Sequence, residues 1–342
     1  MAGQEAVNAP TPKQKLGCWL HERWRLELVL RAPGLARRLG LEWVDLRNRN
    51  ERLEKTPDGA GRICRWQDSS FLTVCRTFPT TGARLLRHVW RERQVGSALP
   101  VSVILPVRGE ARFAAVAFVA ETLRRMAGAE SEVLLCEHDV APRYARDWPR
   151  GVRHLFVPAA ADEAFNKSKA MNAGARAARN PILILLDADA VPSPDFMACV
   201  VACLDGGWEA ARPVRFLFLL DEAASREFLR RGSVEDVGAV AFVHQNNPGL
   251  ATVIRRETYF EIGGHDERFA GWGGEDVEFL DRLRTRKLYP GSFLPAIHLW
   301  HPPAPQKQSG HRNNELLRRI LAEPAESRVV RARRQLAEGA AP

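Results

Sequence analysis

No apolar run in this chain of 342 residues is long enough to cross a membrane, which takes about 20 consecutive apolar residues. The N-terminus also lacks the apolar core of a signal peptide. The six cysteines form no CxxC pair and no spacing of metal ligands, and several stand in apolar runs, as buried thiols do. These absences favour a cytoplasmic protein in a reducing compartment.

Excess positive charge is absent from the middle of the chain, although the formal net charge is +9. Residues 1–99 hold 18 Lys/Arg and 10 Asp/Glu, and residues 312–342 hold 7 Arg and 4 Glu, so the ends account for the excess. The basic ends contain no recognised nucleic-acid motif, and we expect no nucleic-acid partner. A solvated surface explains most of this charge.

The basic N-terminal region is a candidate for peripheral contact with the inner face of a membrane. Trp19 and Trp24 stand there among leucines and arginines, as in an interfacial amphipathic helix. A helix packed on the main domain is the alternative. We predict a disordered segment over residues 1–15, a mainly helical accessory region over 16–99, and a loose helical tail over 321–342.

Residues 100–320 show the alternation of strand and helix patterns that is typical of an α/β domain. Short apolar runs at 101–106, 132–136, 152–157 and 181–186 predict strands, and the segments 110–127 and 165–179 have helical spacing. This alternation predicts a Rossmann-like, mostly parallel sheet flanked by helices. Ligands of such sheets bind beyond the carboxyl ends of the strands.

Asp187 and Asp189 directly follow the fourth predicted strand. Two carboxylates at this edge suit a divalent cation bound to a diphosphate. The alternative is a strand-end turn that caps the next helix, for which Asp195 is an equally good candidate.

A second motif, GWGGED, spans residues 271–276. Trp272 offers a flat apolar face on which a sugar ring could stack. Gly273 and Gly274 allow a ligand to approach the backbone closely. Glu275 and Asp276 would begin a helix, where negative charge is favoured. An ordinary helix start explains the acids but not the Trp-Gly-Gly before them.

Four stretches in this order resemble the β-1,4-galactosyltransferases and related galactosaminyltransferase modules such as those of chondroitin polymerase. They are LPVR (105–108), FNKSKAMNAG (165–174), DAD (187–189) and DERFAGWGGEDVEFLDRL (266–283). The resemblance implies a GT-A fold, a UDP-sugar donor, a carbohydrate or glycoconjugate acceptor, and Mn²⁺.

The resemblance also implies residue roles on the donor side. The segment with Pro106, Arg108 and Glu110 would border the nucleotide. Asp139, or as an alternative Glu137, would meet the uracil or ribose. Lys167 would replace an Arg of the family near the donor, Asp187 would approach the ribose, and Asp189 would hold the metal.

His298 and His301 follow an apolar run, where the galactosyltransferases place a Met and a His as metal ligands. Residues three apart point to opposite faces of a straight strand, so both can bind one ion only if the chain turns between them. We favour His301 and keep His298 as a second candidate. A buried His298 with a hydrogen-bond partner is the alternative. A shell of oxygen and nitrogen suits Mn²⁺, and Zn²⁺ stays open.

The inverting galactosyltransferases use the carboxylate after WGGE as the general base, which assigns that role to Asp276. Glu275 would hydrogen-bond the donor or acceptor sugar. Asn246 takes the place of an aromatic residue that helps to select galactose, so we expect UDP-GalNAc to be tolerated at least as well as UDP-Gal. The alternatives are a retaining or polymerising GT-A enzyme and a non-catalytic nucleotide-sugar-binding module.

Overall fold

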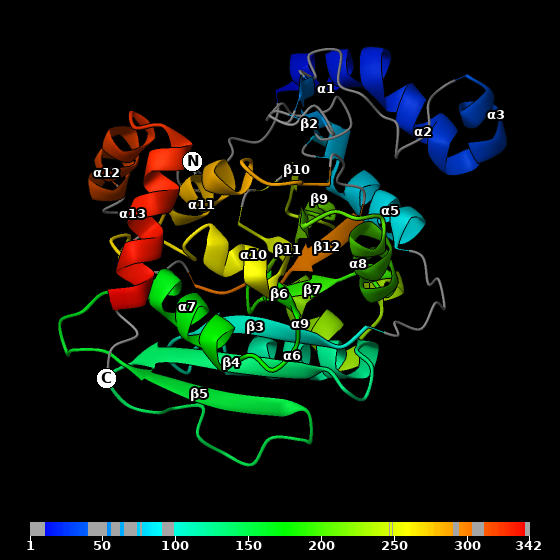
Figure 1. Ribbon diagram of the computed structural model, residues 1–342. Coiled ribbons are helices and arrows are strands. Elements are labelled where there is room, and N and C mark those ends of the chain that lie inside the picture. The colour runs from blue at the N-terminus through cyan, green and yellow to red at the C-terminus, as the bar shows by residue number, and fades with distance from the viewer. Residues whose placement is uncertain are drawn as a thin grey trace.

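The computed structural model describes residues 11–39, 53–55, 62–64, 74–75, 77–90, 99–245, 247, 249–289, 294–302 and 311–338. A six-stranded sheet has the order β5-β4-β3-β6-β11-β8, and its strands β5, β4 and β3 lie at the bottom of Figure 1. The first four strands are parallel to one another, β11 runs antiparallel to both of its neighbours, and β8 therefore has the direction of the first four. The bounds are β3 Val101–Val107, β4 Glu132–Asp139, β5 Val152–Pro158, β6 Ile182–Leu186, β8 Ala210–Ala211 and β11 Ala251–Arg255.

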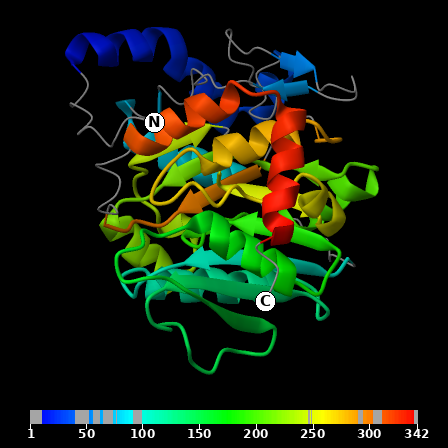
Figure 2. The ribbon, with the colours of Figure 1, turned by 60° about the vertical axis from the view of Figure 1, so that its left-hand side comes forward.

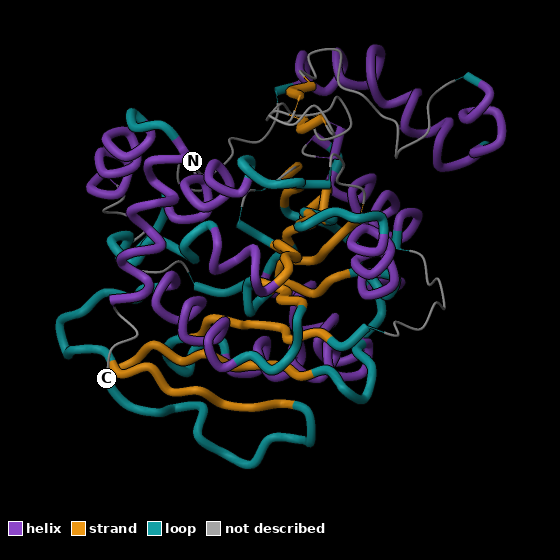
Figure 3. The backbone as a smooth tube through the Cα atoms, in the orientation of Figure 1, coloured by secondary structure: helices purple, strands orange, loops and turns teal. Residues whose placement is uncertain are grey.

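Helices cover both faces of this sheet, which is why its strands are apolar on both sides (Figure 3). In β3, Val103 packs on the side of α6 (Phe113–Met126), whereas Ile104 packs on the side of α7 (Lys167–Ala177). A Cβ at Gly174 in α7 would lie 2.5 Å from Ile104 Cγ2, so only glycine lets this helix approach so closely. The predicted α/β fold with a mostly parallel sheet is confirmed.

A second sheet has the order β10-β9-β12-β7. It was not predicted, because the alternation of strands and helices becomes irregular after Asp189. Its register sets His298 opposite Ala190, beside Asp189. The bounds are β7 Ala190–Pro192, β9 Val214–Leu219, β10 Phe242–Gln245 and β12 Leu294–His298.

The C-terminal helices pack on the α/β domain at the left of Figure 1. In α13, the buried Arg328 lies 3.0 Å from Glu278 of α11 and also pairs with Asp281. The segment predicted as a loose helical tail from residue 321 contains α13, which packs over α11 through this pair. The remaining bounds here are α8 Phe196–Asp205, α9 Glu222–Arg231, the 3-10 helix Val234–Asp236, α10 Arg256–Glu261, α11 Glu275–Leu283, α12 His311–Leu321 and α13 Ala325–Glu338.

The described residues of the N-terminal region are mostly helical, as predicted, but the first helix begins earlier than residue 16. α1 starts at Pro12, inside the segment predicted to be disordered, because Thr11 and Gln14 form a capping box. A small antiparallel pair, β1–β2, was missed. The bounds are α1 Pro12–Cys18, the π-helix Trp19–Arg23, α2 Trp24–Arg31, α3 Pro33–Arg38, β1 Leu53–Lys55, β2 Arg62–Cys64 and α5 Pro79–Val89.

In Figures 1 and 2 the helices α1 to α3 lie along the outside of the molecule, far from the large sheet. Among the described residues, no helix has the length and apolar character of a membrane span.

Candidate active site

Asp187 and Asp189 lie in the turn after β6 and contact different partners. The Asp187 carboxylate lies 2.7 Å from Lys167 Nζ. Asp189 is buried and faces the end of β12. Burial and the neighbouring carboxylates outweigh Lys167 and raise the pKa of Asp187 to about 6. The two carboxylates thus lie at one edge of the sheet, in the turn that directly follows β6.

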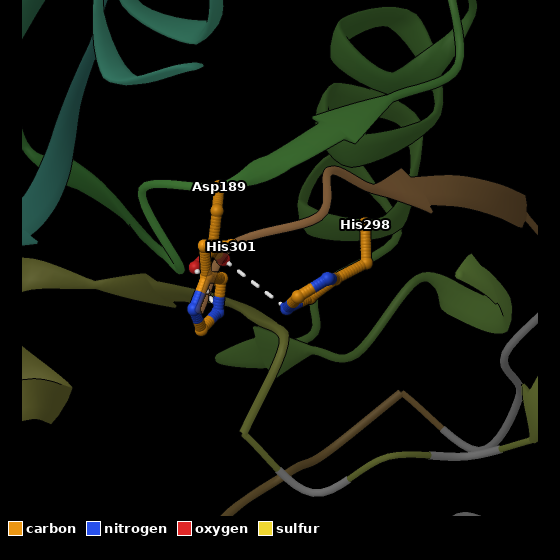
Figure 4. A group of neighbouring side chains, drawn as sticks. All are labelled: Asp189, His298 and His301. Atoms are coloured by element: carbon orange, nitrogen blue, oxygen red, sulfur yellow. Dashed lines mark ion pairs between the residues drawn. The ribbon is translucent and has the colours of Figure 1, made fainter. Parts of the chain in front are cut away.

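Asp189, His298 and His301 form a candidate metal centre. Their possible ligand atoms lie within 4.8 Å of one another. His298 Nε2 is 3.6 Å from one oxygen of Asp189, and His301 Nε2 is 3.2 Å from the other (Figure 4). The strand β12 ends at His298, so the chain turns between the two histidines and both point toward Asp189.

The second nitrogen of His301 also has a partner. His301 Nδ1 lies 2.7 Å from the carbonyl oxygen of Pro302, to which it can donate a hydrogen bond. Such a contact orients the ring and leaves Nε2 as the nitrogen that can bind a metal. A carboxylate and two imidazoles make a mixed oxygen and nitrogen shell, which fits Mn²⁺ or Zn²⁺ better than Mg²⁺.

Arg112 is a cation at this centre that sequence reasoning missed. Its Nη1 donates to Asp189 Oδ2 at 2.9 Å. Burial alone would raise the pKa of Asp189, but His298, His301 and Arg112 together lower it well below its ordinary value. One arginine among 50 Lys/Arg gives no signal in the sequence.

Lys167, at the first position of α7, joins the two acidic motifs. Its Nζ lies 2.7 Å from Asp187 and 3.0 Å from both oxygens of Asp276. Burial lowers the pKa of Lys167, but Asp187, Asp276 and Glu275 outweigh it and raise the pKa above its ordinary value. The lysine therefore stays charged and holds the two aspartates close together.

Glu275 begins α11 beside Asp276. Burial and the adjacent Asp276 raise the pKa of Glu275 to about 7. Its Oε2 is buried and has no hydrogen-bond partner among the described residues. Buried polar atoms rarely stay unpaired, so this oxygen is a candidate contact for a ligand.

The WGG segment before α11 is held by its own conformation and by α12. Gly273 and Gly274 have positive φ, and a Cβ at Gly274 would lie 2.6 Å from the Phe269 ring. Asn313 of α12 donates to the carbonyl oxygen of Trp272 at 3.1 Å. The half-buried Trp272 is thus fixed next to the acidic residues.

The segment after β3 lies against the end of β4. Asp139 accepts a hydrogen bond from the Gly109 backbone at 3.0 Å, and its other oxygen lies 4.0 Å from Arg108 Nε. Arg108 Nη1 is buried without a hydrogen-bond partner in the described part of the chain. A buried, unpaired donor at the carboxyl end of a strand is a second candidate contact for a ligand.

Other candidates on this side are less central. Pro106 is part of buried β3, and the exposed Glu110 lies 3.6 Å from Arg143. The alternative, Glu137, is fully buried. Its carboxylate accepts hydrogen bonds from the backbone N–H groups of Arg143 and Tyr144 and lies 2.8 Å from His154 Nε2. Its oxygens therefore hold the loop after β4 in place. Asn246 lies outside the described residues.

Hydrogen bonds connect the α7 segment to the segment before α11. Asn166 and Asn172 of the FNKSKAMNAG stretch donate to Glu267 and His265, and the Gly271 backbone donates to Phe165. The structure thus unites the last three motifs around Lys167. The segment that follows the first motif joins them through Arg112, which reaches Asp189.

Two glycosyltransferase family models match successive, separate parts of this chain. The model of glycosyl transferase family 2 matches residues 139–211, which include Lys167 and the Asp187–Asp189 turn. The model described as the N-terminal domain of galactosyltransferase matches residues 243–295, which include the GWGGED motif. The resemblance and the glycosyltransferase class that the motifs predict are confirmed.

Chondroitin sulfate N-acetylgalactosaminyltransferase 2 of Homo sapiens is 27% identical over 43% of this chain and 29% of its own length. Validoxylamine A glucosyltransferase of Streptomyces hygroscopicus subsp. limoneus is 28% identical over 37% of this chain and 34% of its own length. The chain thus matches about a third of the length of these relatives. The structure of glucosyl-3-phosphoglycerate synthase from Mycobacterium tuberculosis, in complex with Mn²⁺, UDP and phosphoglyceric acid, aligns with a TM-score of 0.44 and 18% identity over 68% of this chain and 79% of that one.

Proposed function

We propose that this protein transfers a sugar from a UDP-sugar to a hydroxyl group of a carbohydrate or glycoconjugate, with inversion at the anomeric carbon. The observation that carries the proposal is the convergence of Asp189, His298 and His301 with the Lys167–Asp276 pair at one edge of the sheet. The first group suits a metal diphosphate, and the second suits a nucleophile that must lose a proton.

The donor set fits a divalent cation, with Mn²⁺ as the proposed ion. Asp189, His298 and His301 would hold it, and Arg112 would leave Asp189 for another acceptor. When bound, the ion supplies Lewis-acid stabilisation of the diphosphate leaving group. Arg108 and the Asp139–Gly109 contact would border the nucleotide, and Asp187 the ribose.

Asp276 is the proposed general base. A carboxylate has about four lone-pair positions, so Asp276 can keep Lys167 and still accept the proton of an acceptor hydroxyl. A general base positioned at the acceptor hydroxyl supplies a rate factor of about 10²–10⁴. Glu275, partly protonated near neutral pH, would donate or accept a hydrogen bond at a sugar hydroxyl.

The donor sugar is proposed as Gal or GalNAc. The family model over 243–295 and the name of the chondroitin relatives support this choice. A glucosyl donor is the second candidate, because the validoxylamine relatives are glucosyltransferases. A retaining or polymerising reaction would use the same donor site.

UDP release by the purified protein tests the proposal, with Mn²⁺ and a panel of UDP-Gal, UDP-GalNAc, UDP-Glc and UDP-GlcNAc. We expect slow hydrolysis of one donor that EDTA and Asp189→Ala abolish. Asp276→Asn should lower transfer by at least about 10²-fold while UDP binding persists. Near-normal turnover by Asp276→Asn would refute the base, and absence of both turnover and Mn²⁺-dependent UDP binding would refute the site.

A further inference from the structure

The N-terminal arm, residues 12–39, carries a cluster of exposed apolar side chains. The described part of the chain has eleven large apolar side chains that are exposed, and six of them lie in this arm. Trp19 and Trp24 are 55% and 52% exposed, although large aromatic side chains are usually well buried. The six are Leu16, Trp19, Leu20, Trp24, Leu35 and Leu39.

The opposite face of the arm is attached to the body. Leu26 and Val29 are buried, Glu27 accepts two hydrogen bonds from Arg84 of α5, and Arg23 lies over the Phe78 ring. One face of the arm thus packs on the domain, while Trp19 and Trp24 stay exposed on the other face.

A π-helical turn keeps these two faces separate. Leu16, Leu20 and Trp24 are four residues apart, slightly more than the 3.6 residues of an α-helical turn. The wider π-turn over Trp19–Arg23 absorbs the difference, so Trp24 stays in line with the two leucines. π-turns of this kind often mark functional places in helices.

Positive charge surrounds the apolar stripe. Residues 11–39 hold seven Lys/Arg and two Glu, and Glu27 is already paired with Arg84 and Arg31. Lys13, Lys15 and Arg31 are exposed. Two such arms would repel each other, so a second copy of the chain is a poor occupant of this face.

We propose that the arm is an interfacial helix that binds the protein to an anionic lipid surface. Tryptophans and leucines on one stripe, flanked by cations, are the composition that enters the headgroup region of a bilayer. A lipid surface also accepts a single helix face without a complementary shape. The proposal does not depend on the proposed activity, because it concerns another part of the molecule.

Vesicle flotation with the purified full-length protein tests this proposal. We expect binding to phosphatidylcholine vesicles that contain about one third phosphatidylglycerol, little binding to phosphatidylcholine alone, and release at high salt. Trp19→Ser with Trp24→Ser should weaken binding at least about tenfold. Leu321→Ser with Val330→Ser, which removes two exposed apolar side chains from the C-terminal region, should have no effect.

A second pair, Lys15→Glu with Arg25→Glu, keeps the apolar stripe and should weaken binding to the anionic vesicles. Melting temperatures of all variants verify that they fold. Absence of binding to anionic vesicles would overturn the proposal, as would equal losses in the tryptophan and control pairs. So would a dimer in light scattering that Trp19→Ser with Trp24→Ser turns into a monomer, since it would assign the stripe to self-association.

Discussion

Gly249 faces Asp276 so closely that a side chain does not fit there. A Cβ at this position would lie 1.8 Å from Asp276 Oδ2 and 2.4 Å from its Cγ. The glycine therefore lets the proposed base reach Lys167, whose Nζ also lies 3.5 Å from the Gly249 carbonyl oxygen. This contact could not be predicted from the sequence, because Gly249 and Asp276 stand 27 positions apart.

Gly249→Ala should move Asp276 and lower kcat by about 100-fold, since a displacement of about 1 Å in a reacting group has an effect of this size. Overpacking should also lower the free energy of unfolding by about 1–3 kcal/mol. Gly238→Ala is the matched control, because no atom lies within 4 Å of its Cβ position. Steady-state transfer assays and denaturation curves measure both effects.

A double variant separates this contact from general damage. If the alanine acts through Asp276, Gly249→Ala with Asp276→Ala should be no less active than Asp276→Ala alone. Additive losses would contradict the assigned contact.

Lys167 offers a test of the resemblance, because the family has an arginine at this position. Lys167→Met leaves Asp187 and Asp276 without their shared cation, and both carboxylates are only about a quarter exposed. We expect a loss of about 1–3 kcal/mol in stability and a fall in kcat. Lys167→Arg should keep most activity.

Lys169→Met is the matched control in the same helix, since Lys169 pairs with Glu163 outside the acidic cluster. Urea denaturation and UDP release distinguish the variants. An inactive Lys167→Arg together with a fully active Lys167→Met would contradict the assigned role.

At the scale of elements, α7, α10 and α11 meet around His265. Its backbone donates to Asn172 of α7, its ring nitrogen Nδ1 lies 2.9 Å from the Tyr259 hydroxyl of α10, and its ring stacks on Phe279 of α11 at 4.0 Å. The loop that carries GWGGED is thus oriented by a buried imidazole.

Stability should fall at acidic pH because of this imidazole. Burial first, and then Lys167 and Arg282, lower the pKa of His265 well below 6.5. The unfolded chain binds a proton near pH 6.5 and the folded chain does not, so the free energy of unfolding decreases as the pH falls below 6.5. The slope from one group is up to about 1.4 kcal/mol per pH unit. Urea denaturation between pH 5 and 7.5 should give a flatter dependence for His265→Gln, and equal slopes would exclude this group as the cause.

The elements that could be predicted are those with continuous apolar runs. The strands β3 to β6 and the helices α6, α7 and α11 follow from such patterns in the sequence. β7 and β8 could not be found, since strands of three and two residues have no period. The site was predictable where residue types are unusual, as in GWGGED, but Arg112, Gly249 and Asn313 owe their roles to contacts formed only in the fold.

At the scale of the whole molecule, distant segments close over one another. Arg328 of α13 is buried against Glu278 of α11, so the C-terminal helix is part of the domain that was expected to end near residue 320. The salt bridge between Arg328 and Glu278 could not be predicted, because the C-terminal segment is rich in Ala, Glu and Arg and no single arginine stands out. The start of α1 could have been read from the capping box of Thr11 and Gln14, whereas the contact of α2 with Arg84 forms only in the fold.

Metal binding should stabilise the whole fold, because the three ligands come from segments about 110 residues apart and meet only in the folded chain. At an Mn²⁺ concentration of about 100 times its Kd, the gain is about 2.7 kcal/mol. The melting temperature should rise when Mn²⁺ is added and should rise less with Mg²⁺. EDTA should restore the value measured without metal.

Asp189→Asn and the pair His298→Ala with His301→Ala should abolish this rise, whereas Asp147→Asn, an exposed aspartate of the β4–β5 loop, should keep it. Arg112→Gln should increase the rise, since Arg112 occupies one oxygen of Asp189. A rise that survives in both ligand variants would locate the metal elsewhere. The melting temperature could also rise equally with Mg²⁺ and Mn²⁺ in the variant that lacks both histidines. This result would mean that carboxylates alone bind the metal, because Mg²⁺ prefers oxygen ligands.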